Sequence, residues 1–185
     1  GENGPTSLFA GSLWIGCIDA SATLKVAAMT YRQTGNDYWP GPLTSTATTD
    51  ATTCLAWDKF YKLDKEEVEK YITWFNGGQI GVNPTDADDM DVILNWPTLS
   101  PEGQALAPFY DANGNTIYDP YAGDYPDFWL GDGTRPDSAG YQFTACDAEL
   151  FGDQVLFWVF NDKGNVHSET GGAAIGLEIQ AQAFA

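Results

Sequence analysis

Basic residues are scarce in this chain, and their scarcity excludes several classes of function. Eight lysines and arginines stand against 26 aspartates and glutamates, which gives a formal net charge of −18 over 185 residues. Nucleic acids and anionic lipid surfaces bind basic patches, so we expect no nucleic-acid partner and no anionic-lipid partner. No run of about 18 apolar residues occurs, so we also expect no membrane insertion.

Histidine and cysteine are also rare. The three cysteines are Cys17, Cys54 and Cys146. They form no CxxC pair, which argues against structural zinc and leaves open one disulfide with a free thiol or three reduced thiols. The only histidine, His167, precedes Ser168, but neighbours on a strand point to opposite faces and no GxSxG nucleophile elbow is present. We therefore expect structural hydrogen bonds at His167 and no enzyme.

Several segments have the apolar alternation of β-strands. The first forty residues predict a β-hairpin whose turn is DASAT (19–23). Strands joined by short loops are predicted at QVLFWVFND (154–162), VHSETGG (166–172) and IGLEIQAQAFA (175–185). The last of these has one apolar and one polar face, as expected of a half-buried strand.

One helix is predicted, at about residues 64–76. Asp64 and Glu67 have the spacing of a capping box, and an apolar stripe runs from Val68 to Phe75. The chain reads as surface loop over 34–53 and mostly as loop from residue 78 to 152. Loops of this length are uncommon unless something besides apolar burial orders them.

The stretch YDANGNTIYDPYAGDYP (110–126) has the residues of a calcium-binding loop, and a bound calcium ion could order the long loops. Calcium binds six to eight oxygen ligands, and alternating Asp and Asn side chains present oxygens from one loop. The predicted ligands are the side chains of Asp111, Asn113, Asn115, Asp119 and Asp124 and the main-chain carbonyl of Ile117. The spacing follows the first part of an EF-hand loop, then departs: Thr116 replaces its glycine and Ala122 its glutamate. The alternative is a set of polar turns stabilised by side-chain to backbone bonds.

Two other groups of residues raise binding hypotheses. A second acidic cluster comprises Asp86, Asp88, Asp89 and Asp91. It lacks the alternation and is typical of a solvated run, so a second ion there stays open. Among seven tryptophans, Trp39 and Trp129 fall in predicted loops, where aromatic faces could stack on sugar rings. The alternative for each is packing in the core.

Four segments together resemble one recurrent module. They are SLFAGSLWIGCIDASATLKVAAMTYRQTGNDYWPGPL, CLAWDKFYKLDKEEVEKY, LAPFYDANGNTIYDPYAGDYP and GDQVLFWVFNDKGNVHSETGGAAIGLEIQAQAFA. They are similar to the N-terminal module of large secreted or cell-surface proteins of Bacteroidota that are exported by the type IX (gliding-associated) secretion system. The resemblance covers nearly the whole chain and implies an extracellular, non-catalytic, β-rich module that continues into a longer chain.

The resemblance also implies covalent features. Cys17 stands where that family has a glycine and Cys146 lies in an insertion, which suggests a Cys17–Cys146 disulfide. The tripeptide DSA (137–139) resembles the O-glycosylation signal of these bacteria, with Ser138 as the acceptor.

We therefore expect one β-rich domain over residues 1–185, a fragment of a longer chain. Its fold class would be mainly β, with β-sandwich-like antiparallel sheets, one short amphipathic helix and long calcium-stabilised loops. Its role would be that of a structural or adhesive module at the cell surface. Its partners would be other subunits, further domains of the same polypeptide or surface glycans, and subunits could join by strand addition at an exposed sheet edge. The alternative is a carbohydrate-binding module of a secreted enzyme.

Overall fold

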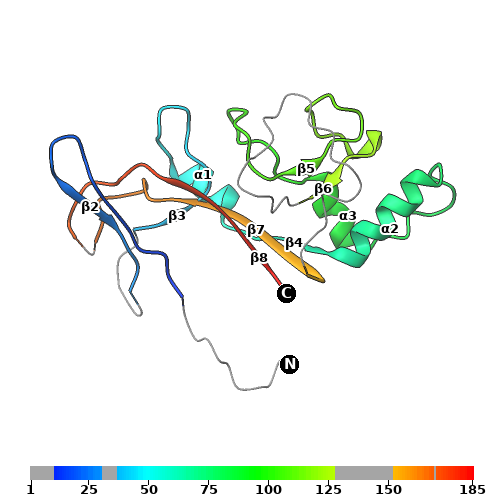
Figure 1. The fold of residues 1–185 in the computed structure, drawn as a ribbon, viewed down its shortest axis with the longest axis horizontal. Coiled ribbons are helices and arrows are strands. Elements are labelled where there is room, and N and C mark those ends of the chain that lie inside the picture. The colour runs from blue at the N-terminus through cyan, green and yellow to red at the C-terminus, as the bar shows by residue number, and fades with distance from the viewer. Residues whose placement is uncertain (1–10, 31–36, 128–151, 169) are drawn as a thin grey trace, which may run out of the picture. The chain divides into compact units, whose positions relative to one another are not determined.

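The computed structural model describes residues 11–30, 37–127, 152–168 and 170–185. The chain divides into two compact units: unit 1 comprises Gly1–Lys59 and Val159–Ile179, and unit 2 comprises Phe60–Trp158 and Gln180–Ala185. In the described residues the architecture is mainly β, with strands in antiparallel pairs and three α-helices (Figure 1).

Unit 1 contains the predicted β-hairpin. Strand β1 (Ile15–Ile18) pairs antiparallel with β2 (Leu24–Ala27). Asp19 shapes the turn, because its carboxylate accepts backbone N–H groups from Ser21 and Thr23 at 2.9 and 3.0 Å. The hairpin prediction is confirmed, with strands shorter than the apolar segments suggested.

Two further elements of unit 1 interrupt the predicted surface loop. Strand β3 (Trp39–Pro40) pairs antiparallel with the end of β7 (Gln154–Asn161). Helix α1 (Ala51–Trp57) follows, and the Asp50 carboxylate caps it by accepting the Thr53 N–H at 2.8 Å. The prediction of a continuous loop was wrong here, because β3 exists only through its partner strand and Asp50 starts a helix.

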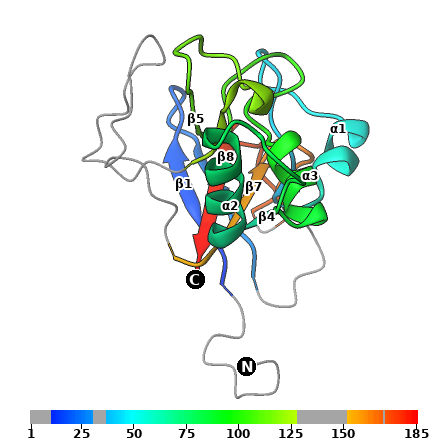
Figure 2. The ribbon, with the colours of Figure 1, turned by 90° about the vertical axis from the view of Figure 1, so that its right-hand side faces the viewer.

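Unit 2 is built around β4 (Tyr61–Asp64), which pairs antiparallel with β7, and around α2 (Lys65–Asn76). Its other elements are α3 (Ala87–Leu94), β5 (Phe109–Tyr110), the 3-10 helix η1 (Pro120–Ala122) and β6 (Tyr125–Pro126). Helix α2 contacts α3, β4 and β6. Figure 2 shows α3 and β4 next to it. Residues 78–152 were predicted to be mostly loop, and that prediction did not include α3.

Helix α2 has the predicted bounds but not the predicted cap. Asp64 is the N-cap residue without a capping hydrogen bond, and its carboxylate instead accepts the Gln154 side-chain amide at 2.8 Å. Glu67 accepts the backbone N–H of Asp86 at 2.5 Å. The prediction of a capping box was wrong, because the side chains of Asp64 and Glu67 both bond to other parts of unit 2.

Strand β7 buries every second side chain, as its sequence predicts. Val155 and Phe157 belong to the core of unit 2, and Val159 and Asn161 to that of unit 1. The largest other buried apolar residues of unit 2 are Leu63, Val68, Tyr71, Ile93, Trp96 and Leu106.

The C-terminal strand is confirmed as β8 (Glu178–Phe184), which pairs with β7 and exposes Gln180 and Gln182. The strand predicted at 166–172 is wrong. This segment turns back on itself: the Gly171 N–H donates to the His167 carbonyl at 2.8 Å, and the His167 N–H donates to the Gly172 carbonyl at 2.9 Å.

Candidate metal centre

The loop that contains the predicted calcium ligands is closed by two short strands of unit 2. β5 and β6 pair antiparallel, with Tyr110 opposite Tyr125. The two tyrosine rings stack, with centroids 4.7 Å apart and planes 17° from parallel. Residues 111–124 therefore leave and re-enter one small sheet at adjacent points.

Asp111 organises the first half of this loop. Its Oδ1 accepts the N–H groups of Gly114 and Asn115 at 2.8 and 3.2 Å, and its Oδ2 accepts the N–H of Thr116 at 2.6 Å. Three bonds from successive backbone amides to one carboxylate wrap the chain around it. Asn113 and Asn115 continue the pattern, since their side-chain oxygens accept the N–H groups two residues ahead at 3.0 and 2.8 Å.

Thr116 takes a left-handed backbone conformation, with φ at +64°. It occupies the position where an EF-hand loop has its glycine, and the chain makes the corresponding bend without one. The left-handed region costs a residue with a Cβ atom about 1–2 kcal/mol. The loop therefore keeps a strained residue at this position.

Asp124 ties the two halves of the loop together. Its carboxylate is fully buried, and it accepts the Ala112 N–H at 2.9 Å and the Asp119 N–H at 2.8 Å. Burial raises the pKa of Asp124, the two backbone N–H groups lower it in part, and the nearby charges of Asp111 and Asp119 raise it further. In the described part of the chain, no basic side chain forms an ion pair with Asp124.

Two tyrosines fix the base of the loop to the helices of unit 2. The buried Tyr71 of α2 donates its hydroxyl to the carbonyl of Pro120. Tyr118 donates its hydroxyl to the Ile93 carbonyl of α3 at 2.5 Å. Burial raises the pKa of Tyr71 to about 12, and the charges of Asp124 and Asp119 add to that increase, so its hydroxyl keeps its proton at physiological pH.

The ligand chemistry of the loop relies on more than carboxylates. Among the described residues, no three carboxylate, imidazole or thiolate side chains form a group that could hold a metal by themselves. An ion at the loop would therefore take part of its oxygens from Asn113, Asn115 and the Ile117 carbonyl. That mixture of carboxylate, amide and carbonyl oxygens is the type calcium prefers.

The second acidic cluster lies at the start of α3, where it caps the helix. Asp86 is the N-cap and accepts the Asp88 N–H at 2.8 Å. Asp89 is buried, and this burial together with the charge of Asp64 raises its pKa. Asp88 and Asp89 lie in the first helical turn, where acidic residues interact favourably with the helix dipole.

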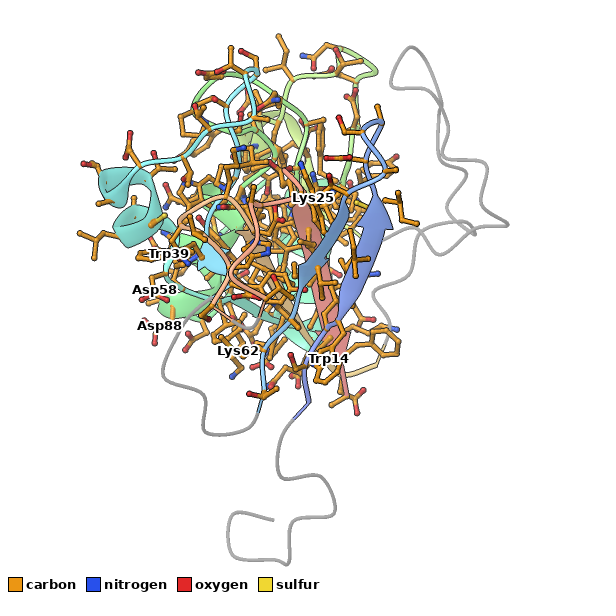
Figure 3. All side chains as sticks on the ribbon, turned by 90° about the vertical axis from the view of Figure 1, so that its left-hand side faces the viewer. Trp14, Lys25, Trp39, Asp58, Lys62 and Asp88 are labelled. Atoms are coloured by element: carbon orange, nitrogen blue, oxygen red, sulfur yellow. The ribbon has the colours of Figure 1, made fainter. Side chains whose placement is uncertain are left out.

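The predicted sugar-binding tryptophans have different positions. Trp39 lies in β3 (Figure 3), where it is half-buried. Its indole N–H donates to the Asn165 side chain. Its ring lies directly against Gly164, where an added Cβ would overlap the indole. Trp39 thus packs on the turn that follows β7. Trp129 lies outside the described residues.

The predicted covalent sites are only partly within the structure. Cys17 is half-buried on β1 and Cys54 is buried in α1, and these two described cysteines form no disulfide with each other. Cys146 and Ser138 lie outside the described residues, so the Cys17–Cys146 disulfide and the glycosylation of Ser138 stay predictions.

The only histidine lies in a buried polar cluster of unit 1 that the sequence does not reveal. His167 Nδ1 is 2.6 Å from the Val26 carbonyl oxygen and Nε2 is 2.8 Å from the Asp162 carbonyl oxygen. Each carbonyl can accept the proton of the ring nitrogen that faces it. The buried carboxylates of Asp37 and Asp162 lie 4.0 and 3.4 Å from the ring nitrogens.

This arrangement gives His167 a structural role, as predicted. Ser168 donates its hydroxyl to Asp37 at 3.1 Å and not to the imidazole, so these residues do not form a hydrolytic triad. Asp162 in turn accepts the N–H groups of Ile175, Gly176 and Leu177 at 2.6–2.8 Å. The cluster therefore holds the turn after β7 against the hairpin.

No family model matches this chain, and no curated protein or solved structure matches it either. None of its described helices has the length and apolar character needed to cross a bilayer. The case for a function therefore rests on the chain's own residues, above all on the loop at 111–124.

Proposed function

We propose that the chain is a non-catalytic structural or adhesive module whose loop at 111–124 binds one calcium ion. The ligands are the side chains of Asp111, Asn113, Asn115, Asp119 and Asp124 and the carbonyl of Ile117. The bound ion stiffens the loop, so that a surface built from loops keeps one shape for a partner. The packing of the sheets as a sandwich is part of the same proposal.

The observation that carries this proposal is the burial of Asp124 beside two other acids. A buried carboxylate that accepts two N–H bonds but is paired with no cation is still costly, and a bound cation lowers that cost. The backbone bonds to Asp111 and Asp124 use some of their lone pairs and leave others for a metal, because a carboxylate has about four acceptor positions. Thr116 supports the same reading, since its left-handed conformation reproduces the bend of a calcium loop.

We place the module at the cell surface or outside the cell. The support is the resemblance to secreted modules of Bacteroidota together with the net charge of −18, which suits a protein that recruits cations. Its partners in this role are other subunits or further domains of the same polypeptide.

Thermal unfolding in calcium and in excess chelator tests the metal site. Calcium at 100 times its dissociation constant adds about 2.7 kcal/mol, which corresponds to a rise in Tm of several degrees. Asp111→Ala should abolish this calcium-dependent rise. The variant also loses three backbone hydrogen bonds, so the quantity compared is the difference between its two melts and not its absolute Tm.

Asp88→Ala is the matched control, because Asp88 is an exposed acid on α3 in the same unit. It should keep the full calcium-dependent rise. Equal melts of the wild-type protein in calcium and chelator would contradict the metal site and leave 110–126 as a set of polar turns.

A further inference from the structure

His167 is a buried side chain with a hydrogen-bond acceptor at each ring nitrogen. The residue is 1% exposed. Its Nδ1 lies 2.6 Å from the Val26 carbonyl oxygen of β2, and its Nε2 lies 2.8 Å from the carbonyl oxygen of Asp162, directly after β7. A neutral imidazole has one N–H and one bare nitrogen, so it can donate to only one of these carbonyls. Only the doubly protonated ring donates to both.

Two buried carboxylates lie beside the same ring. Asp37 and Asp162 are fully buried, and their Oδ2 atoms lie 4.0 Å from Nδ1 and 3.4 Å from Nε2, respectively. Among the ion pairs of the described residues, neither carboxylate has a basic partner other than His167. A nearby opposite charge favours the charged form of a titratable group, whereas burial opposes it. The two acids therefore stabilise the protonated ring over the neutral one.

The other described groups that face the cluster add no competing positive charge. Burial, and then the charges of Asp162 and Asp37, raise the pKa of Tyr38, so its hydroxyl stays protonated and neutral. Burial raises the pKa of Asp37, but bonds from two backbone N–H groups and from the Ser168 hydroxyl lower it below its ordinary value. Asp37 is therefore ionised at neutral pH, and the imidazole is the group of this cluster whose proton changes in the physiological range.

The cluster holds the β1–β2 hairpin through the end of β2 and the residue that follows it. Three hydrogen bonds do so: from His167 to the Val26 carbonyl, from the Tyr38 hydroxyl to the Ala27 carbonyl, and from the Ala28 N–H to Asp37. Within the described residues, β1 and β2 form a sheet of two strands, which is only marginally stable in water by itself. The order of the hairpin therefore depends on these bonds.

We propose that His167 is held as an imidazolium and is a pH-sensitive switch that fastens the β1–β2 hairpin to the turn after β7. Loss of the ring proton leaves a bare nitrogen facing a carbonyl oxygen and leaves two buried acids without their cation. The folded chain keeps a proton that the unfolded chain releases near pH ~6.5, so stability falls as the pH rises and the hairpin is released. The cluster shares no residue with the calcium loop, so the switch does not depend on the metal site.

Nitrogen NMR of the wild-type chain tests the protonation state directly. His167 is the only histidine, so a 15N-labelled sample gives the signals of one imidazole. We expect both ring nitrogens to carry a proton at about pH 7, where a histidine in an unfolded chain is mostly neutral. A ring with one bare nitrogen at that pH would overturn the proposal.

Hydrogen exchange of the same protein tests the release of the hairpin. Once the ring proton is lost, the protection of the β2 and Ala28 amides, corrected for the intrinsic rate at each pH, should fall about tenfold or more. The amides paired between β4 and β7 belong to unit 2 and should keep their protection. Unchanged protection of β2, or an equal loss in both regions, would contradict a switch located at the hairpin.

Two variants assign the effect to the imidazole. His167→Gln keeps every other titratable group, so the fall in Tm that the wild type shows between about pH 6 and pH 9 should become smaller. Ser168→Ala is the matched control, because it removes a neutral bond to Asp37 and keeps the ring, and it should retain the full fall. The reverse result would overturn the proposal. If His167→Gln does not fold, the two measurements on the wild type still decide it.

Discussion

Thr116 has a backbone conformation that costs free energy for threonine and none for glycine. Thr116→Gly should therefore raise the free energy of unfolding by about 1 kcal/mol, after allowance for the greater entropy of glycine in the unfolded chain. Chemical denaturation checks this value. Ala22→Gly in the hairpin turn, where φ is +61°, should give a similar gain. A loss at Thr116 together with a gain at Ala22 would show that the threonine side chain contributes more than its strain costs.

Gly123 follows η1, and two features of its position exclude any residue with a side chain. Its φ is +104°, and an added Cβ would come within 2.6 Å of the Phe75 ring of α2. Gly123→Ala should therefore cost at least about 2–3 kcal/mol, from backbone strain and overpacking together. Gly103→Ala, with φ at +81° and open space around the added carbon, measures the strain alone and should cost less. Equal losses in denaturation experiments would contradict the close contact between this loop and α2.

At the scale of elements, the sequence predicts the long regular segments and misses the short ones. The hairpin, α2 and β7 each contain several residues of consistent periodicity, so their pattern is visible without a structure. Helices α1 and α3 have seven and eight residues, too few for a clear apolar stripe, and their capping residues Asp50 and Asp86 were interpreted as loop. The two-residue strands β3, β5 and β6 exist only because distant partners pair with them.

The same limit applies to polar contacts. The alternating Asp and Asn of the loop at 111–124 are local in sequence, so a candidate set of ligands could be proposed from the sequence alone. The contacts of Tyr71 and Tyr118 beneath it could not, because they join residues 49 and 25 positions apart. The cluster around His167 joins residues up to 141 positions apart and carries no sequence signal.

The Asp37 cluster predicts a dependence of stability on pH. Burial raises the pKa of Asp37, but bonds from the Ala28 and Ser168 N–H groups and the Ser168 hydroxyl, together with nearby His167, lower it below its ordinary value. A lowered folded-state pKa means that the stabilisation is complete above the unfolded value of about 4 and is lost as pH falls below it. The contribution of Asp37 to the free energy of unfolding should therefore decrease as the pH falls below about 4.

Asp37→Asn isolates this contribution. It should cost about 2–3 kcal/mol at neutral pH, because charge-assisted bonds are lost, and it should lose less stability than the wild-type protein on acidification. Asp58→Asn, at an exposed acid of unit 1, should match the wild-type pH profile. Parallel acid profiles for Asp37→Asn and the wild type would contradict the assignment.

At the scale of the whole molecule, the excess of acidic over basic residues has the largest influence on how the protein binds cations. A chain with a net charge of −18 attracts cations to its entire surface, so calcium will have general effects on stability besides those of any specific site. Binding at a specific site differs from this general attraction in three ways. It saturates, it has a fixed stoichiometry, and substitutions in one loop abolish it. Binding heat and stoichiometry therefore test the calcium proposal more directly than stability does.

Isothermal titration of calcium into the chelator-treated protein, at physiological ionic strength, is the decisive measurement. We predict saturable binding of one ion per chain, lost in Asp111→Ala and kept in Asp88→Ala. Magnesium should not reproduce it, because magnesium demands octahedral geometry that an irregular loop of mixed ligands does not supply. Heats that do not saturate, or a saturable site that Asp111→Ala leaves intact, would contradict the assignment of calcium to the loop at 111–124.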